Sequence, residues 1–147
     1  MVRKTSLAFV ACLVFGFAVP GKDFDKEVPS ELQGTWTGRQ ISAAGPIEKQ
    51  AALSTHVLTI TGNGFTWNKF NGTVEDTGKL EVRSNQKPGQ IDFVIKAKEE
   101  LRKQGIFELK DGSLTLCLGE YGAERPKQFK AGDNTSVYIW TKKPKTK

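Results

Sequence analysis

The chain has 147 residues, of which 37% are hydrophobic, and a formal net charge of +6. This length suits one domain that buries a core of its own. A nucleic-acid-binding protein usually shows a basic stripe interleaved with aromatic residues on its folded body, whereas here the basic excess lies at the two ends of the chain. The composition therefore favours a single globular domain without a nucleic-acid partner.

Residues 1–21 have the layout of a secretory signal peptide. Two basic residues come first, and an unbroken apolar run of 13 residues extends from Leu7 to Val19. A transmembrane helix needs about 20 apolar residues, so the run is too short for a membrane span. Small residues near its end predict cleavage after Ala18 or Gly21. We therefore expect an exported protein, periplasmic or extracellular.

The two cysteines, Cys12 and Cys117, have different expected fates. A lipoprotein signal would place its cysteine at the end of the apolar run, whereas here the run continues past Cys12. We therefore do not expect lipid anchoring at Cys12, which is lost with the signal. Cys117 then remains alone, which excludes an intramolecular disulfide, and we expect it to pack as a small hydrophobic residue.

The predicted mature body is electrically neutral. Of the 22 basic residues, Arg3 and Lys4 belong to the predicted signal, and four lysines lie at the C-terminal end: Lys142, Lys143, Lys145 and Lys147. The 16 basic residues that remain balance 16 acidic ones. Residues 144–147 therefore form a basic tail, for which we expect at most weak contact with anionic surfaces.

Ordered structure is expected to begin near Ser30 or Leu32. Residues 22–30 are charged, contain Pro29 and lack periodicity, which predicts a linker. The stretch from Leu32 to Ile41 is a plausible first strand. Residues 43–55 follow Gly45-Pro46 with a short run that could form one or two helical turns.

Two turn signals then organise the chain from His56 onward. Gly62-Asn63 separates two alternating runs and predicts a hairpin that pairs Leu58 with Trp67 and Ile60 with Phe65. Asn71-Gly72 is the next turn, and it pairs Lys69 with Val74. Asp76 then falls on the inward face, which predicts either a bulge there or a polar site inside.

Residues 84–90 contain Lys87-Pro88-Gly89 and predict a loop. Residues 90–97 alternate again and predict a strand. The charged stretch from Lys98 to Gln104 fits either a helical turn, through the pair Glu99 and Lys103, or a solvated loop.

The best-specified hairpin lies between Gly105 and Leu118. Asp111-Gly112 is the two-residue connection of a type I′ turn, in which both positions need positive φ. This turn fixes a register in which one face is apolar, and Cys117 falls on the other side of the strand. The apolar face carries Phe107, Leu109, Leu114, Leu116 and Leu118, and the opposite face carries Glu108, Lys110 and Thr115.

Residues 119–133 are irregular, and residues 135–141 predict a last strand rich in β-branched and aromatic residues. The sequence therefore predicts an all-β fold of eight antiparallel strands with at most short helical turns. Such a meander closes most simply into an up-and-down, lipocalin-like barrel, because closure removes both sheet edges. A sandwich is the alternative.

Several segments resemble a family of exported lipocalin-like domains from planctomycete bacteria, whose function is unassigned. The resemblance covers residues 31–143 and rests on Leu32-Gln33-Gly34-Thr35-Trp36, Lys87-Pro88, Ile91-Asp92, Gly105 to Leu109, Asp111-Gly112, Leu114 to Leu118 and Arg125-Pro126. Gly34-Thr35-Trp36 also resembles the Gly-x-Trp of true lipocalins, in which an arginine packs over the tryptophan. Here Lys142 or Lys143 would take that place. The resemblance implies a small β-barrel but neither a known ligand nor a reaction.

No catalytic constellation is visible, so we expect no enzyme, no cofactor and no metal. His56 is the only histidine and has no cysteine or acid at metal-ligand spacing. The acidic neighbours Glu99-Glu100 and Asp23 with Asp25 lie in charged segments, where solvated charge is the simpler interpretation. Neither a glycine-rich phosphate loop nor a Gly-x-Ser-x-Gly turn is present.

Two functions of different class remain. The first is a binding module that holds a small apolar or amphipathic ligand inside the barrel, where Asp76 either orients an amine or hydroxyl of the ligand or lies at a bulge near the rim. The second is a structural or interaction protein of the cell envelope with a filled core, in which exposed Tyr121 and Tyr138 would serve as contacts. The residues predicted to line the ligand site are Leu58, Phe65, Trp67, Asp76, Leu80, Phe93, Phe107 and Leu116.

Overall fold

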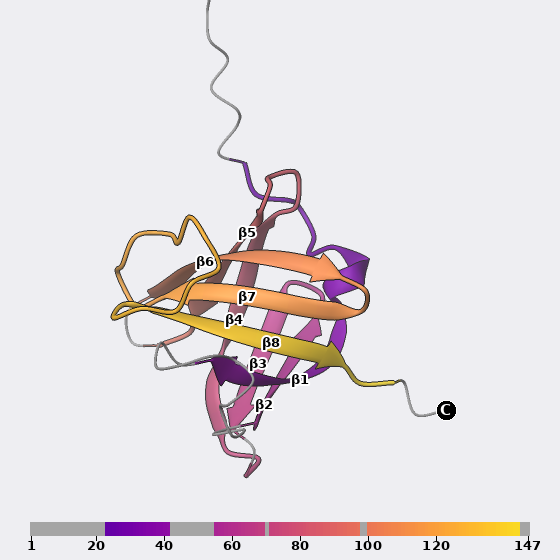
Figure 1. Cartoon of the computed structure of the whole chain (residues 1–147). Coiled ribbons are helices and arrows are strands. Elements are labelled where there is room, and N and C mark those ends of the chain that lie inside the picture. Colours follow the sequence, from indigo (N-terminus) through magenta and orange to yellow (C-terminus); the bar gives the residue numbers. More distant parts are fainter. Residues whose placement is uncertain (1–22, 42–54, 70, 98–99, 145–147) are drawn as a thin grey trace, which may run out of the picture.

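A computed structural model describes residues 23–41, 55–69, 71–97 and 100–144 as one closed β-barrel (Figure 1). Each strand pairs antiparallel with the next, and β8 closes the barrel onto β1. The predicted eight-stranded up-and-down barrel is therefore confirmed. The strands are β1 (Gly34–Ile41), β2 (Thr55–Thr61), β3 (Gly64–Lys69), β4 (Val74–Arg83), β5 (Gly89–Ile95), β6 (Leu101–Lys110), β7 (Ser113–Gly119) and β8 (Thr135–Lys142), and one short 3₁₀ helix, η1 (Ser30–Leu32), precedes them.

The β6–β7 hairpin has the predicted turn and register. Asp111 and Gly112 have φ values of 49° and 74°, as a type I′ turn requires. Phe107 pairs with Leu116, and Leu109 pairs with Leu114. Leu109 nevertheless is 37% exposed, because β6 extends past the packed interior at this end. The prediction that Leu109 belongs to the core was wrong, although its strand parity was right.

The barrel interior is filled by large apolar side chains, which occupy alternate positions in β2, β3, β4, β5 and β7. Trp140 is fully buried, and its ring lies so close over Gly38 that a Cβ there would stand 2.4 Å from the indole. Only glycine fits at this position of β1, since any side chain would displace the ring. The interior cluster consists of Val28, Leu32, Trp36, Leu58, Ile60, Phe65, Trp67, Leu80, Val82, Ile91, Phe93, Ile95, Phe107, Leu114, Leu116, Leu118 and Trp140.

The N-terminal segment closes one end of the barrel, called the η1 end below. Figure 1 shows this indigo segment passing the β4–β5 turn and entering η1. Val28 and Leu32 join the interior cluster, and Asn63 in the β2–β3 turn accepts a hydrogen bond from the Val28 N–H at 2.8 Å. Residues 23–30 therefore pack against the barrel rather than forming the free linker that their composition suggested.

A second apolar cluster lies outside the barrel wall. Its buried members are Ile41, Ile106, Cys117 and Val137, and Ala131 in the β7–β8 connection packs against them. The Cys117 thiol donates a weak hydrogen bond to the carbonyl of Lys130 at 3.7 Å, and its burial raises the pKa of the thiol. Cys117 thus points away from the inward leucines, as predicted, and is a buried free thiol.

Three local predictions need correction. The first strand begins at Gly34, because the residues just before it form η1. The helical turn or loop predicted for 98–104 is replaced from Leu101 onward by β6, which pairs with β5. Asn68 rather than Lys69 pairs with Val74, because the β3–β4 ladder contains a bulge. The helical turns predicted within 43–55 and the signal peptide fall almost entirely outside the described residues.

Among the described residues, no helix is long and apolar enough to cross a membrane.

Candidate functional site

The end of the barrel opposite η1, called the mouth below, gathers polar side chains on the interior face. The eight predicted ligand-lining residues divide between the core and this end. Seven of them are at most 9% exposed and belong to the interior cluster, namely Leu58, Phe65, Trp67, Leu80, Phe93, Phe107 and Leu116. Asp76 lies at the rim of the mouth, where its side chain is 18% exposed. Trp67, which pairs with Asp76, is its apolar neighbour on the adjacent strand β3.

The bulge in β4 supplies two neighbouring carboxylates to the mouth. Trp67 pairs with Asp76 and Asn68 pairs with Val74, so Glu75 is the extra residue between them. The Glu75 carboxylate reaches across β3 to within 3.6 Å of His56 Nδ1. The sequence signalled this bulge, since a regular strand would carry a lone Asp76 into the apolar face. It did not signal that the partly exposed Glu75 would approach His56.

His56 and Trp67 form a buried polar pair. Trp67 Nε1–H donates a hydrogen bond to His56 Nδ1 at 3.2 Å. An indole N–H can only donate, so Nδ1 must be unprotonated and the imidazole neutral. Burial lowers the pKa of His56, and Lys69 adds to this effect, while Glu75 opposes it. Burial together with Lys69 outweighs the nearby carboxylate in this pKa shift, so Glu75 and His56 are neighbours rather than an ion pair.

Lys103 projects from β6 into the mouth. It pairs with inward-facing Phe93 and lies on the same strand face as Phe107. Its Nζ lies 3.5 Å from Asp76 Oδ2 and 4.4 Å from the centre of the Tyr121 ring. The Tyr121 hydroxyl donates to Asp76 at 3.3 Å. Burial of the ammonium works against its charge, but Tyr121 and Asp76 outweigh burial and raise the pKa of Lys103.

Tyr138 on β8 faces the interior rather than solvent, which corrects its prediction as an exposed contact. Its ring stands edge-on to Trp67, with centroids 4.9 Å apart, and stacks on Trp140 at 5.9 Å. Burial raises the pKa of its phenol, so the hydroxyl stays protonated and available as a donor. Tyr121, by contrast, is 43% exposed, as predicted. We define the mouth cluster as His56, Trp67, Glu75, Asp76, Lys103, Tyr121 and Tyr138.

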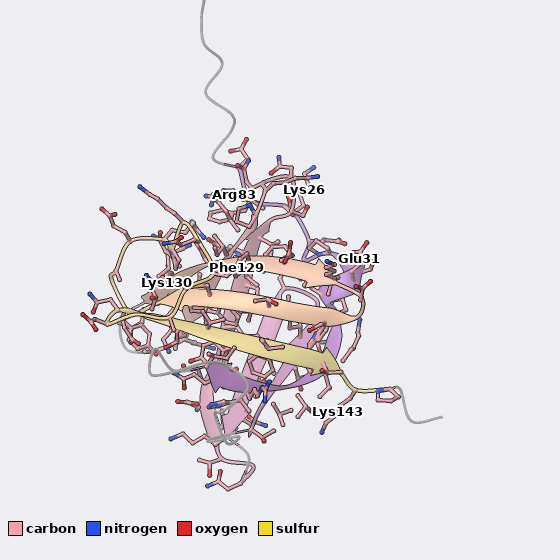
Figure 2. All side chains as sticks on the ribbon, in the orientation of Figure 1. Lys26, Glu31, Arg83, Phe129, Lys130 and Lys143 are labelled. Carbon is pink, nitrogen blue, oxygen red and sulfur yellow. The ribbon has the colours of Figure 1, made fainter. Side chains whose placement is uncertain are left out.

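A separate hollow of about 720 Å³ lies at the η1 end. Its walls include Leu32, Pro88 and Phe107 together with the partly exposed Leu109 and Phe129. Figure 2 labels Glu31 at this end of the barrel. Among the predicted ligand-lining residues, Phe107 alone contacts this hollow, so the hollow and the mouth are distinct places.

A buried ion network on the outer wall was not predicted from the sequence. Asp92 is 2% exposed, and Arg102 donates to its Oδ2 at 3.0 Å while Arg125 pairs with Oδ1. Arg125 also donates to the carbonyl of Gly105 at 2.6 Å, which fixes the β7–β8 connection to β6. Asp92 stands between two apolar strand residues and could have been noticed as an acid within a buried run. Its partner Arg125 gave no such signal, since it lies in an irregular stretch.

The described part of the chain offers no group of three or more histidine, cysteine or acidic residues that could hold a metal ion.

Comparison of the chain with protein-family models, with curated proteins and with solved structures found no match in any of the three.

Proposed function

We propose that this protein binds a small amphipathic molecule at the mouth of its barrel. The rings of Trp67 and Tyr138 would form the apolar floor, and Asp76 with Lys103 would provide the polar contacts. The observation that carries the proposal is the concentration of inward-facing polar side chains at one end of an otherwise apolar interior. Ligand sites are mostly apolar surfaces with a few placed polar groups, and this end of the barrel has that composition.

The proposed ligand site lies at the mouth of the barrel, whereas the sequence predicts a site deep in the interior. Eight-stranded barrels have interiors that are either filled by side chains or able to hold one small ligand. Here bulky rings take the interior volume, including Trp36, Phe93 and Trp140. Of the residues predicted to contact a ligand, Trp67 and Asp76 therefore keep that role.

We further propose that the chain is an exported lipocalin-like protein that acts by binding rather than by catalysis. Support for the lipocalin-like part comes from Gly34 and Trp36 at the start of β1, with the ammonium of Lys142 over the indole at 5.1 Å. In the lipocalins that this segment resembles, a basic side chain packs over the tryptophan at this position. The apolar run from Leu7 to Val19 supports export.

The test is a fluorescence titration of the mature protein with a panel of fatty acids, sterols and aromatic metabolites, after native mass spectrometry for any co-purifying molecule. Trp67 lies at the proposed floor, so filling the mouth should change its emission. Asp76→Asn should weaken binding of a responding ligand at least several-fold. The matched control is Phe129→Ala, which alters the hollow at the η1 end and should leave the affinity unchanged.

The alternative is an envelope interaction protein with a filled barrel. The observation in its favour is the hollow of about 720 Å³, because Leu109 and Phe129 expose apolar surface there. A protein that carries no ligand and gives no response across the panel would favour this alternative. Binding that is lost in Phe129→Ala but kept in Asp76→Asn would likewise contradict a site at the mouth.

A further inference from the structure

The ammonium of Lys103 occupies a place that has the features of a binding site for amines. It lies over the face of the Tyr121 ring, 4.4 Å from its centre, and 3.5 Å from the Asp76 carboxylate. A cation over an aromatic face is attracted by the quadrupole of the ring, and more strongly where water is excluded. The carboxylate adds a charge-assisted contact. Proteins use these two elements together to recognise ammonium groups.

The contacts that hold Lys103 in this place are long. Its contact with Asp76 measures 3.5 Å, and the Tyr121 hydroxyl lies 3.3–3.4 Å from the two oxygens of the same carboxylate. Charge-assisted hydrogen bonds usually measure about 2.7–2.9 Å, so the carboxylate is not tightly engaged. Lysine is a point charge on a flexible stem of four carbons, and its side chain can therefore leave the carboxylate for water.

Among the residues that the structure describes, acidic side chains outnumber basic ones around Asp76. The bulge places Asp76 at the rim with an 18% exposed side chain and brings the Glu75 carboxylate, which is 38% exposed, to within 3.6 Å of His56 Nδ1, while Lys103 is the cation that contacts Asp76. His56 is neutral, because it accepts the indole hydrogen of Trp67 and its pKa is lowered by burial. Farther out, Lys69 near His56 and Glu120 near Tyr138 offset each other in charge. In this described part of the mouth, two carboxylates against one ammonium favour a cationic ligand over an anionic one.

From this geometry we infer that the ligand of the mouth is an amphipathic amine, whose ammonium displaces that of Lys103 from Asp76 and Tyr121. The apolar part of the amine would then lie against the rings of Trp67 and Tyr138, which stand 4.9 Å apart edge to face. This inference rests on the proposed function, since it names the ligand class of the same site. Lys103 then competes with the ligand's ammonium for Asp76 and Tyr121, and it neutralises the Asp76 carboxylate when no ligand is bound.

The test compares three probes that share a phenylethyl group and differ in the charge of its terminal group: phenethylamine, 2-phenylethanol and 3-phenylpropionate. Each is titrated against the mature protein by calorimetry and tryptophan fluorescence. We expect the amine to bind most tightly and the carboxylate most weakly. Lys103→Met should strengthen binding of the amine by about tenfold, if Lys103 blocks the site about nine-tenths of the time, because apparent affinity scales with the open fraction. Asp76→Asn should abolish the preference for the amine.

Lys69→Met is the matched control, because it removes a lysine at the same end of the barrel that does not contact Asp76. Circular dichroism and denaturation establish that each variant folds. If Lys103→Met does not fold, Lys103→Gln replaces it, with the same expected gain. Binding of 3-phenylpropionate that is lost in Lys103→Met, or weaker amine binding in that variant, would overturn the inference and make Lys103 an anion contact.

Failure of this inference and failure of the proposed function give different results. If phenethylamine does not bind but a neutral or anionic ligand binds and depends on Asp76 or Trp67, the inference is overturned and the mouth remains a ligand site. If no probe or panel member binds, both are overturned.

Discussion

The ammonium of Lys142 lies 5.1 Å from the centre of the Trp36 ring and donates a hydrogen bond to the carbonyl oxygen of Glu31 at 3.0 Å. The Trp36 indole in turn donates to the carbonyl of Leu32 at 2.9 Å. One lysine on the last strand thus joins the first strand and η1. Gly34 adopts a φ of 115° at this point, and a Cβ there would meet Lys142 Cε at 3.2 Å.

This relationship predicts that Lys142→Met destabilises the barrel while Lys142→Arg does not. Methionine keeps most of the apolar stem but loses the cation and the hydrogen bond to η1. A cation over an aromatic ring at an exposed site is worth about 0.5–1 kcal/mol, and we expect a loss of that size in the free energy of unfolding. Denaturant titration measures it, with the neighbouring exposed Lys143→Met as the control. An equal loss in both variants would mean that the contact with Trp36 contributes nothing.

The two faces of the β6–β7 hairpin should respond differently to truncation. Leu116 is fully buried, so Leu116→Ala should cost about 2–5 kcal/mol, as for other large-to-small core changes. Leu109 has the same parity but is 37% exposed, and Leu109→Ala should cost clearly less. Glu108→Ala should change the free energy of unfolding by no more than about 0.5 kcal/mol, as expected for an exposed site. Similar losses for Glu108 and Leu116 would contradict the register.

The turns and the alternating apolar residues were sufficient to predict the barrel. Asp111-Gly112 fixed one register because a slip of one residue would reverse both faces of the hairpin. The same logic placed Leu58 opposite Trp67, and the structure has this pair. Such patterns are local, and an up-and-down barrel is built almost entirely from pairs of consecutive strands.

The mouth cluster could be predicted only in part, because its members converge from distant strands. Asp76 is visible in the sequence as a polar residue on an apolar face, but Lys103 lies in a charged stretch that predicts either a helical turn or a solvated loop. The position of Lys103 depends on where β6 begins, which no turn signal marks. Tyr138 lies in the last strand, where its inward direction depends on the register with β7 across the irregular β7–β8 connection. Long-range register of this kind leaves no local trace in the sequence.

Asp92 should be among the most sensitive polar positions. Asp92→Ala leaves Arg125 and Arg102 without their shared carboxylate on the outer wall. Breaking a buried ion pair from one side typically costs about 3–5 kcal/mol, and we expect the lower part of this range because Arg102 is partly exposed. Glu100→Ala, which removes an exposed partner of the same arginine, should cost at most about 1 kcal/mol. Comparable losses in thermal or chemical unfolding would mean that Asp92 is not the centre of the network.

Export remains a prediction that one measurement decides. We expect the mature protein to begin near Val19 or Lys22, because the apolar run ends in small residues suited to signal peptidase. N-terminal sequencing of protein recovered from the periplasm or the medium measures this directly. A soluble product that retains Met1 would contradict the signal peptide.

The stability of the barrel should fall as the pH drops below about 6.5. Burial holds the pKa of His56 below its ordinary value of 6.5, and protonating Nδ1 would break the hydrogen bond from Trp67. In the unfolded chain His56 binds its proton at about pH 6.5, whereas the folded chain resists protonation to a lower pH. The unfolded state therefore binds more protons as the pH falls through this window, and the free energy of unfolding decreases with it.

The chain has a single histidine, so no other imidazole contributes to the pH dependence in this range. One imidazole resonance in the NMR spectrum should titrate below 6.5 in the folded protein. Denaturation between about pH 5 and 6.5, above the range in which ordinary carboxylates titrate, should show a slope that His56→Gln removes. Glutamine keeps a polar group at this position but cannot titrate. A folded-state pKa at or above 6.5 would mean that Glu75 outweighs burial, and stability would then hold or rise as the pH falls.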